Sequence, residues 1–376
     1  MSFEKIKGNF GFGCMRLPMA GDEVDHEHFA KMVDAFMESG FNYFDTAHGY
    51  IKGKSETAIK ACLTSRYPRE SYVLTDKLSG FLFEKHEDIL PLFESQLKAC
   101  GVDYFDFYLM HSQNKAGFEK FKACRAYETA LELLREGRIK HFGISFHDKA
   151  EVLEEILTAY PEIEVVQIQF NYADYDDASV DSRRVYEVCR KFGKPIIIME
   201  PVKGGALVNL PEEAQEVFAA LGGGSNASYA IRFAAGFDGV FMVLSGMGNM
   251  DMINDNCSYM KSFKPLDERE MAAVDRVRDI FRSMNLIQCT ACRYCTDVCP
   301  AGVAIPGIFA CLNDEHRNKG KGWAGSYYYG VHTKAGGRAS ECIECGACEG
   351  ICPQALPIRE LLKSAVNTFE KKEDKD

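Results

Sequence analysis

Two copies of one cysteine run lie near the C-terminus of this 376-residue chain. Each has the spacing Cys-x2-Cys-x2-Cys-x3-Cys-Pro, the first over residues 289–300 and the second over residues 342–353. Three thiolates on so short a loop can hold one face of an iron–sulfur cube. A tetrahedral zinc site is the alternative, but four cysteines followed by proline fit zinc poorly, and two such runs fit it worse. We therefore expect two [4Fe–4S] clusters in the last quarter of the chain.

Residues 286–360, which contain both runs, resemble bacterial-type two-cluster ferredoxin modules. In those modules the cysteine before the proline binds the cluster of the other run. The resemblance therefore implies crossed ligation. The first cluster would be held by Cys289, Cys292, Cys295 and Cys352, and the second by Cys342, Cys345, Cys348 and Cys299.

Charge and hydropathy exclude some partners. The net charge of −11 argues against binding of nucleic acid or of an anionic membrane by the whole surface. The sequence holds no run of about 18 apolar residues that could span a membrane, and its N-terminus, MSFEKIKGNFGFG, lacks the apolar stretch of a signal peptide. We expect a cytoplasmic protein with no nucleic-acid or membrane partner.

Strand and helix patterns alternate through the first 260 residues. Eight short runs rich in Phe, Val, Ile and Tyr predict strands, and amphipathic stretches between them predict helices. The expected strands are 10–13, 42–46, 72–77, 105–111, 141–146, 165–170, 195–200 and 240–245. This number of units in about 250 residues is typical of a (β/α)8 barrel. An open doubly wound sheet is the alternative, but Arg16 interrupts the glycine-rich loop that such a sheet would need after its first strand.

These patterns divide the chain into four parts. Residues 1–262 are expected to form the α/β barrel, and residues 263–285 a connecting helix. Residues 286–362 would form a small ferredoxin-like iron–sulfur domain, and residues 363–376, which end in EKKEDKD, a charged tail.

Polar residues follow the second, third and fourth predicted strands. The segment FDTAHGY delivers Asp45 and Tyr50, YVLTDKL delivers Lys77, and FYLMHS delivers His111. In a barrel enzyme the chemistry lies at these C-terminal strand ends. The four residues resemble the Asp-Tyr-Lys-His tetrad of the aldo-keto reductases. The resemblance continues through GFGCMRLP, FGIS, VVQIQFNY, MEPVKGG and LSGMGNMDMINDN, along residues 1–260.

The resemblance implies carbonyl reduction by hydride transfer. A free tyrosine, with a pKa of about 10, is a poor acid near neutrality, and a nearby ammonium favours its phenolate. Lys77 would act in this way on Tyr50, and Asp45 would hold Lys77 by an ion pair. His111 would donate a hydrogen bond to the substrate oxygen or help the proton to move. In the oxidative direction Tyr50 becomes the base.

By the same resemblance, a nicotinamide cofactor would lie across the strand ends. The positions expected to contact it are Gly13, Met15, Arg16, Ser145, Gln167, Met199, Ser245, Gly246, Met247, Asn249, Asp255 and Asn256. Ser145 and Gln167 would touch the carboxamide, and Asp255 and Asn256 the adenine. Gly246 and Met252 stand where NADP-preferring members usually carry a basic residue, which favours NADH slightly, because a 2′-phosphate needs Arg or Lys beside it.

Four departures from the family pattern admit a flavin as an alternative cofactor, and Gly246 and Met252 are two of them. Met199 replaces the aromatic ring that many relatives stack on the nicotinamide, and Phe146 replaces a common asparagine. Nicotinamide passes two electrons as hydride, whereas each cluster takes one, and FMN or FAD can do both. The sequence shows no flavin fingerprint.

Three functions fit these features. The first is an oxidoreductase that exchanges hydride with a small carbonyl or alcohol and relays single electrons through both clusters to a carrier such as ferredoxin. In the second, the barrel is the same enzyme but the clusters are structural, because metal ligation can supply folding energy to a small module. The third is a redox sensor or electron-carrier subunit with a non-catalytic barrel.

Overall fold

The computed structural model of the chain describes residues 3–178, 180–318 and 322–370. The chain divides into two compact units. Unit 1 comprises Met1–Val202 and Leu221–Val274, and unit 2 comprises Lys203–Ala220 and Asp275–Asp376. The segment 203–220, which the sequence analysis assigned to the barrel domain, thus groups with the cysteine-rich residues.

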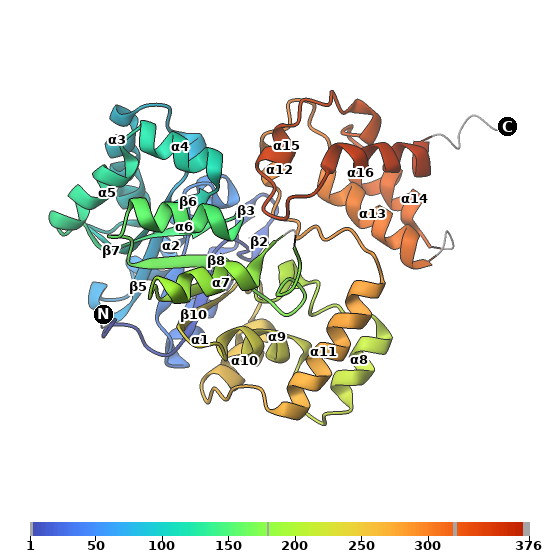
Figure 1. Cartoon of the computed structure of the whole chain (residues 1–376), viewed down its shortest axis with the longest axis horizontal. Helices are drawn as coiled ribbons and strands as arrows, with labels where there is room; N and C mark the ends of the chain where they lie inside the picture. The colour runs from blue at the N-terminus through green and yellow to red at the C-terminus, as the bar shows by residue number, and fades with distance from the viewer. Residues whose placement is uncertain (1–2, 179, 319–321, 371–376) are drawn as a thin grey trace. The chain divides into compact units, whose positions relative to one another are not determined.

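Eight parallel strands of unit 1 close into a barrel, in the order β1-β10-β9-β8-β7-β6-β5-β4 (Figure 1). They are β1 (Phe10–Gly13), β4 (Tyr43–Asp45), β5 (Val73–Leu78), β6 (Phe105–Gln113), β7 (Ile139–Phe146), β8 (Val165–Gln169), β9 (Ile196–Met199) and β10 (Val240–Ser245). The barrel closes because β1 pairs with both β4 and β10, with Phe12 opposite Ser245. This confirms the predicted barrel and excludes the open sheet. A short hairpin, β2 (Met19–Ala20) and β3 (Glu23–Val24), follows β1.

The barrel interior is filled by alternate residues of the strands, as the period of two requires. Tyr43, Val73, Phe107 and Leu109 belong to this layer. Gly11 of β1 contributes no side chain, since a Cβ there would lie 2.7 Å from Leu244 Cδ2. The interior is therefore a packed core. Polar residues that lie two positions further along the same strand faces reach the C-terminal end of the barrel.

Helices of unit 1 cover the barrel with their apolar stripes. They are α1 (His26–Glu38), α2 (Lys54–Ile59), α3 (His86–Cys100), α4 (Lys115–Ala123), α5 (Ala126–Arg135), α6 (Ala150–Ala159), α7 (Ser182–Lys191), α9 (Asn226–Ala235) and α10 (Met250–Met260). In α1 the carboxylate of Asp25 caps the first turn by accepting from the His28 amide. Phe29 and Phe36 of this helix pack against Phe12 of β1 at ring distances of 5.7 and 5.5 Å. Apolar residues spaced along one face in this way give the helical periodicity from which these helices were predicted.

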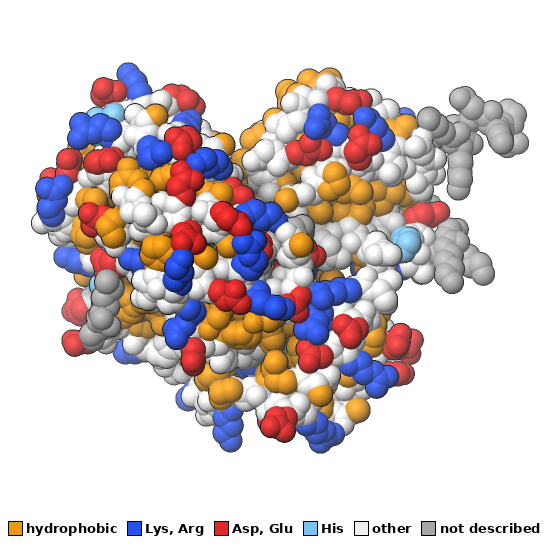
Figure 2. Space-filling view, viewed as in Figure 1, with side chains coloured by type: hydrophobic (Ala, Val, Ile, Leu, Met, Phe, Trp, Pro, Cys, Tyr) orange, Lys and Arg blue, Asp and Glu red, His pale blue; other side chains and the backbone are white. Residues whose placement is uncertain are grey.

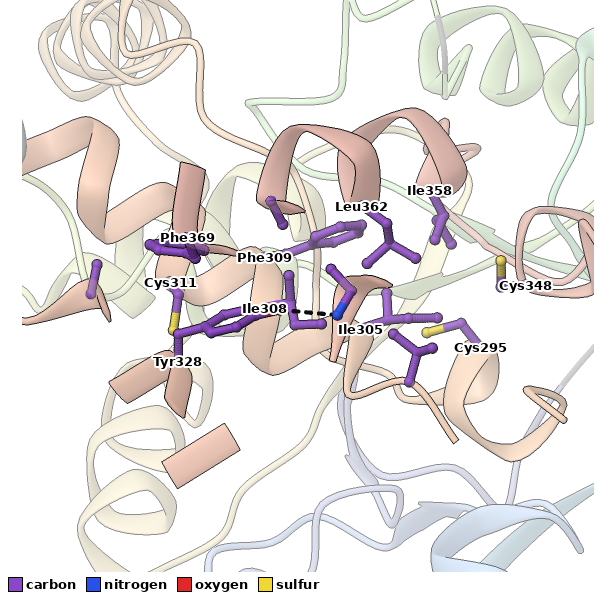
Figure 3. Packing of buried hydrophobic residues seen from close by; sticks show 14 residues of the cluster. Cys295, Ile305, Ile308, Phe309, Cys311, Tyr328, Cys348, Ile358, Leu362 and Phe369 are labelled. Carbon is purple, nitrogen blue, oxygen red and sulfur yellow. Dashed lines mark hydrogen bonds between the residues drawn. The ribbon is translucent and has the colours of Figure 1, made fainter. Parts of the chain in front are cut away.

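Unit 2 consists of helices, most of which surround a small apolar core to which α8 contributes no residue. They are α8 (Glu212–Ala219), α12 (Tyr294–Asp297), α13 (Ile305–Asn318), α14 (Ala324–Tyr327), α15 (Ala347–Gly350) and α16 (Ile358–Ala365), and α11 (Glu268–Ser283) contains the boundary between the units. Figure 3 shows Ile308, Phe309 and Leu362 in the middle of this core, with Cys295 and Cys348 together at one end.

The expected charged tail begins later than residue 363. Residues 363–365 end α16, and residues 366–370 continue as a helical turn. Ala365 and Phe369 are buried in the core of unit 2, so their apolar spacing, which the charge pattern obscured, holds this stretch to the domain. Residues 371–376 lie outside the described residues.

Charged side chains of both signs are interspersed on the face drawn in Figure 2. Among the described residues, no helix is both long enough and apolar enough to cross a membrane.

Candidate functional site

The C-terminal strand ends of unit 1 bring the four tetrad residues together. Asp45 ends β4, two residues after the interior Tyr43, and Lys77 lies in β5, two residues after Thr75. His111 lies in β6, and Tyr50 follows β4 in a short turn. All four side chains are at most 9% exposed. The four residues that were singled out at the predicted strand ends thus lie in one buried group.

Lys77 is the centre of this group. Its Nζ lies 2.6 Å from Asp45 Oδ1, 2.7 Å from the Thr46 carbonyl oxygen and 3.3 Å from the Tyr50 hydroxyl. Burial raises the pKa of Asp45, and the Lys77 ammonium opposes that rise. The ion pair is fully buried, so removing either partner would leave an uncompensated charge.

His111 stands beside the phenol and is held neutral. Its ring centroid lies 5.9 Å from that of Tyr50, edge to face, and its Nδ1 lies 2.6 Å from Ser79 Oγ. Burial, and then the positive charge of Lys77, lower the pKa of His111 well below its usual value. A neutral imidazole whose Nδ1 is engaged with a hydroxyl is fixed in orientation and can act as a hydrogen-bond partner to a carbonyl oxygen.

Gln167 contacts the tetrad itself. Its Nε2 donates to Asp45 Oδ2 at 3.1 Å, so this amide holds the carboxylate that in turn holds Lys77. Ser145, at the neighbouring strand end, accepts from the Ser112 amide at 2.7 Å. Ser145 lies near the end of β7 and opposite Gln167 in the middle of β8, and the structure adds a positioning contact for Gln167 that the sequence did not reveal.

The ends of β1 and β10 meet beside each other. A Cβ on Gly13 would lie 3.5 Å from the Gly246 nitrogen, and one on Gly246 would lie 3.7 Å from Arg16 Cβ. Ser245 Oγ accepts from Asn256 Nδ2 at 3.1 Å, which ties this edge to α10. Among the other predicted positions, Met247 is buried, Met15 and Met199 are half-buried, and Asn249 caps α10 by accepting from the Met252 amide.

A cavity of about 690 Å³ opens next to these residues within unit 1. It is lined by the loop 221–225, by Asp255 and Tyr259 of α10, and by Arg232, Arg269 and Glu270. Ser225 caps α9 and donates to Asp255 Oδ2 at 2.6 Å. This loop was not among the predicted site residues. Its three glycines followed by a helix-capping serine nevertheless indicate a backbone that can approach a phosphate closely.

Arg232, one of the two arginines that line the cavity, is paired with an acid. The two terminal guanidinium nitrogens of Arg232 contact the Glu270 carboxylate, at 2.7 and 2.8 Å. Arg232 is therefore held by an acid of the same cavity lining.

A buried carboxyl pair lies next to the tetrad in sequence. Carboxylate oxygens of Glu56 and Asp76 lie with the Cys100 sulfur within 4.8 Å of one another. His48 Nδ1 lies 2.8 Å from Glu56 Oε2. Burial raises the pKa of Glu56 to about 7, and burial and then the Glu56 charge raise that of Asp76. The pair therefore retains a proton near neutrality.

We expect the stability of unit 1 to fall between pH 5 and pH 8 on account of this pair. The pKa of Glu56 is higher in the folded than in the unfolded state, so its contribution is complete below the unfolded value and is lost as the pH rises through 7. The loss is on the order of 3 kcal/mol. In Glu56→Gln, urea midpoints at pH 5 and pH 8 should differ less than in the parent chain. An unchanged difference would contradict the assignment.

The eight run cysteines of unit 2 gather in two groups of four. The first cysteine cavity is lined by Cys289, Cys292, Cys295 and Cys352. The second cysteine cavity is lined by Cys299, Cys342, Cys345 and Cys348. Each group takes three cysteines from one run and the fourth from the other, which is the grouping that crossed ligation requires.

Both loops adopt the same backbone. Ala291 and Glu344, the third residues of the runs, have φ of 53° and 56°, and Arg293 and Gly346, the fifth, have 68° and 79°. These left-handed residues turn the Ala291 and Glu344 amides toward Cys289 Sγ and Cys342 Sγ, each at 3.4 Å. Amides directed at sulfur stabilise thiolates in iron–sulfur sites.

The donor set fits a metal cluster. Burial, and then the neighbouring thiols of Cys292 and Cys289, raise the pKa of Cys295 to about 12. Four thiols crowded in an apolar cavity lose their protons only to a cation that replaces them. Sulfur ligands in this arrangement suit [4Fe–4S] clusters.

Comparison with known proteins relates each part to a family. The family model described as the aldo/keto reductase family matches residues 9–279, and the 4Fe-4S dicluster domain matches residues 288–356. The chain is 27% identical over 196 residues to the NADH-specific methylglyoxal reductase of Escherichia coli K12, covering 46% of this chain and 57% of that protein. It is 27% identical over 206 residues to the uncharacterised oxidoreductase YtbE of Bacillus subtilis, covering 54% and 66%. The chain thus spans less than two thirds of the length of these relatives.

Solved structures share the barrel. The aldo-keto reductase of Klebsiella pneumoniae in complex with NADPH aligns with a TM-score of 0.59 at 17% identity, covering 72% of this chain and 90% of that one. The aldose reductase of Giardia lamblia aligns with a TM-score of 0.57 at 20% identity, covering 73% and 94%. At such identities the likeness shows the fold.

Proposed function

The chain belongs to the aldo/keto reductase family and carries a 4Fe-4S dicluster domain, and on this premise we propose that it exchanges hydride between NADH and a small carbonyl or alcohol. The tetrad of Asp45, Tyr50, Lys77 and His111 would transfer the proton. The two clusters would relay single electrons to or from a carrier protein such as ferredoxin. The buried contacts of Lys77 with Asp45 and Tyr50 carry this proposal.

The geometry suits proton transfer at one atom, the Tyr50 oxygen. When bound, NADH supplies the hydride and the clusters exchange electrons singly. Tyr50 donates its proton to the carbonyl oxygen, and the Lys77 ammonium at 3.3 Å stabilises the phenolate that remains. Asp45 and the Thr46 carbonyl oxygen fix Lys77. His111, neutral and held by Ser79, orients the substrate oxygen.

The cavity charges support NADH as the coenzyme. Asp255, expected at the adenine end of the coenzyme, lies in the cavity lining beside the glycine loop, where its negative charge would repel a 2′-phosphate. Arg232 is paired with Glu270. The three acids of the lining outnumber its two arginines, Arg232 and Arg269, so the charge of the cavity does not favour that phosphate. Met252, at a position usually basic in NADP-preferring members, is 46% exposed.

Replacing the acid in this cavity should weaken coenzyme discrimination. For Asp255→Asn we expect the ratio of kcat/KM for NADH to that for NADPH to fall about tenfold, because one unit of charge repulsion is removed. Asp238→Asn, an exposed acid of unit 1 outside the cavity, is the matched control and should leave the ratio within twofold. A parent chain that prefers NADPH would contradict the proposal.

One anaerobic experiment tests the whole proposal. The purified protein is analysed for iron, sulfide and any released nicotinamide or flavin, and is then mixed with NADH and a panel of small carbonyls that includes methylglyoxal. We expect coenzyme-dependent carbonyl reduction, and bleaching of the cluster absorbance by reduced ferredoxin. Bound FMN or FAD would favour the flavin alternative. Clusters that no donor bleaches would favour the structural role.

We place this chemistry in the cytoplasm. Fifteen cysteines, of which seven lie outside the two runs and are buried as free thiols, are typical of a reducing compartment.

A further inference from the structure

The segment 203–220 of unit 2 brings a buried lysine to the first cysteine cavity. Lys203 is 2% exposed, and its Nζ lies 3.4 Å from Gln354 Oε1. Gln354 lines that cavity. The next residue, Gly204, packs directly on the first run, because a Cβ there would lie 2.6 Å from the Thr290 carbonyl oxygen. Thr290 also lines the cavity.

The backbone at Lys203 is strained. Its φ is 48°, in the left-handed region, and Gly204 and Gly205 follow at 64° and 99°. A lysine pays a steric penalty in this region that glycine avoids. The turn therefore has a lysine at a position where glycine would be less strained. A residue held in a strained backbone conformation indicates a functional role.

The internal repeat of unit 2 shows what is particular to this cavity. The two runs are offset by 53 residues, so most lining residues of the first cavity have a counterpart that lines the second, Pro306 with its counterpart Arg359 being an exception. Thr290, Arg293 and Gln354 line the first cavity. Their counterparts in the second are Ile343, Gly346 and Ala301. With the same thiol arrangement and the same left-handed turns, the two cavities differ mainly in polarity and charge.

We propose that Lys203 raises the reduction potential of the first cluster and so separates the potentials of the two clusters. A reduced cluster carries one more negative charge than an oxidised one. A buried ammonium next to the lining therefore stabilises the reduced form more, and the low dielectric around it keeps the effect large. The second cavity has apolar residues or glycine at the corresponding lining positions. Lys203 is thus a positioning and tuning residue of the iron–sulfur unit, and this role depends on the clusters and not on hydride transfer.

A redox titration of the full-length holoprotein, followed by electron paramagnetic resonance without substrate or coenzyme, tests this. In Lys203→Met, which keeps the length of the side chain, one midpoint potential should fall by 59 mV or more, a tenfold change in the oxidised-to-reduced ratio for one electron. The other midpoint should stay in place. Lys203→Arg, which keeps the charge, should restore most of the shift.

Two further variants make the result decisive. Lys363→Met removes an exposed lysine of α16, the helix whose Leu362 lines the second cavity. This variant should change the oxidised-to-reduced ratio of either cluster less than twofold. Lys203→Gln replaces Lys203→Met if the latter fails to hold its iron. The proposal would be overturned if Lys203 variants with full iron content changed the oxidised-to-reduced ratio of both clusters less than twofold. A shift in Lys363→Met as large as that in Lys203→Met would also overturn it. The readout is independent of carbonyl reduction, so it stands or fails separately from the proposed enzyme activity.

Discussion

Carbonyl reduction should fall by about 10³-fold in kcat when Tyr50 is replaced by phenylalanine, within the range that a positioned general acid contributes. The Tyr50 oxygen is the atom that Lys77 approaches at 3.3 Å, and removing it leaves no proton donor at that point. The aromatic ring remains to pack edge to face on His111. The coenzyme affinity and the iron content should therefore match those of the parent chain. Steady-state rates on the best carbonyl of the panel, with iron counts, give the answer.

Tyr43→Phe is the matched control for this loss. Tyr43 lies on β4, the strand before Tyr50, is fully buried, and accepts a hydrogen bond from Thr75 Oγ1 at 2.6 Å. Its replacement should cost about 1 kcal/mol of stability for the lost hydrogen bond and change kcat less than threefold. A Tyr50→Phe protein with near-full turnover would refute the tetrad assignment, and an equal loss in Tyr43→Phe would show that the effect is not specific to Tyr50.

The parts of this fold that follow a local period were predictable from the sequence. Strand ends were found within a few residues because apolar runs end where the barrel does, and Asp45, Lys77 and His111 follow interior residues at the strand period of two. The grouping of Cys352 with the first run followed from the ferredoxin resemblance, because spacing within a run says nothing of the other run.

The parts that depend on tertiary contacts were not predictable. Gln167 was expected to face a cofactor, but nothing in VVQIQ shows that its amide would hold Asp45 across the barrel. The membership of 203–220 in unit 2 depends on the packing of Gly204 against Thr290, 86 positions apart in the sequence. The burial of Phe369 was not predicted because the residues after it are mostly charged. The composition of the whole stretch indicated a solvated tail, although this one ring packs into the core of unit 2.

Cysteines that are far apart in the sequence line the same cavity in unit 2. We therefore predict that cysteines of different runs hold the same cluster. Cys352→Ser should abolish the cluster signal that Cys289→Ser also abolishes, although the two residues belong to different runs, because both line the first cysteine cavity. Cys299→Ser should instead match Cys342→Ser, its neighbour in the second cavity. Each variant should lose about half of the iron and sulfide, the share of one cluster of two.

Losing a cluster should also loosen unit 2, because its core is small and the ligands tie its two loops together. The matched control is Cys311→Ser, a buried core thiol that lines neither cavity, which should keep its full iron content. Iron and sulfide counts, paramagnetic resonance of the reduced protein and limited proteolysis measure these outcomes. If Cys352→Ser removed the same signal as Cys342→Ser, ligation would run within each run, and the cavities described here would be wrongly paired. The crossed pattern matters for function because two clusters that share both loops are held at a fixed separation, which an electron relay requires and a single structural metal does not.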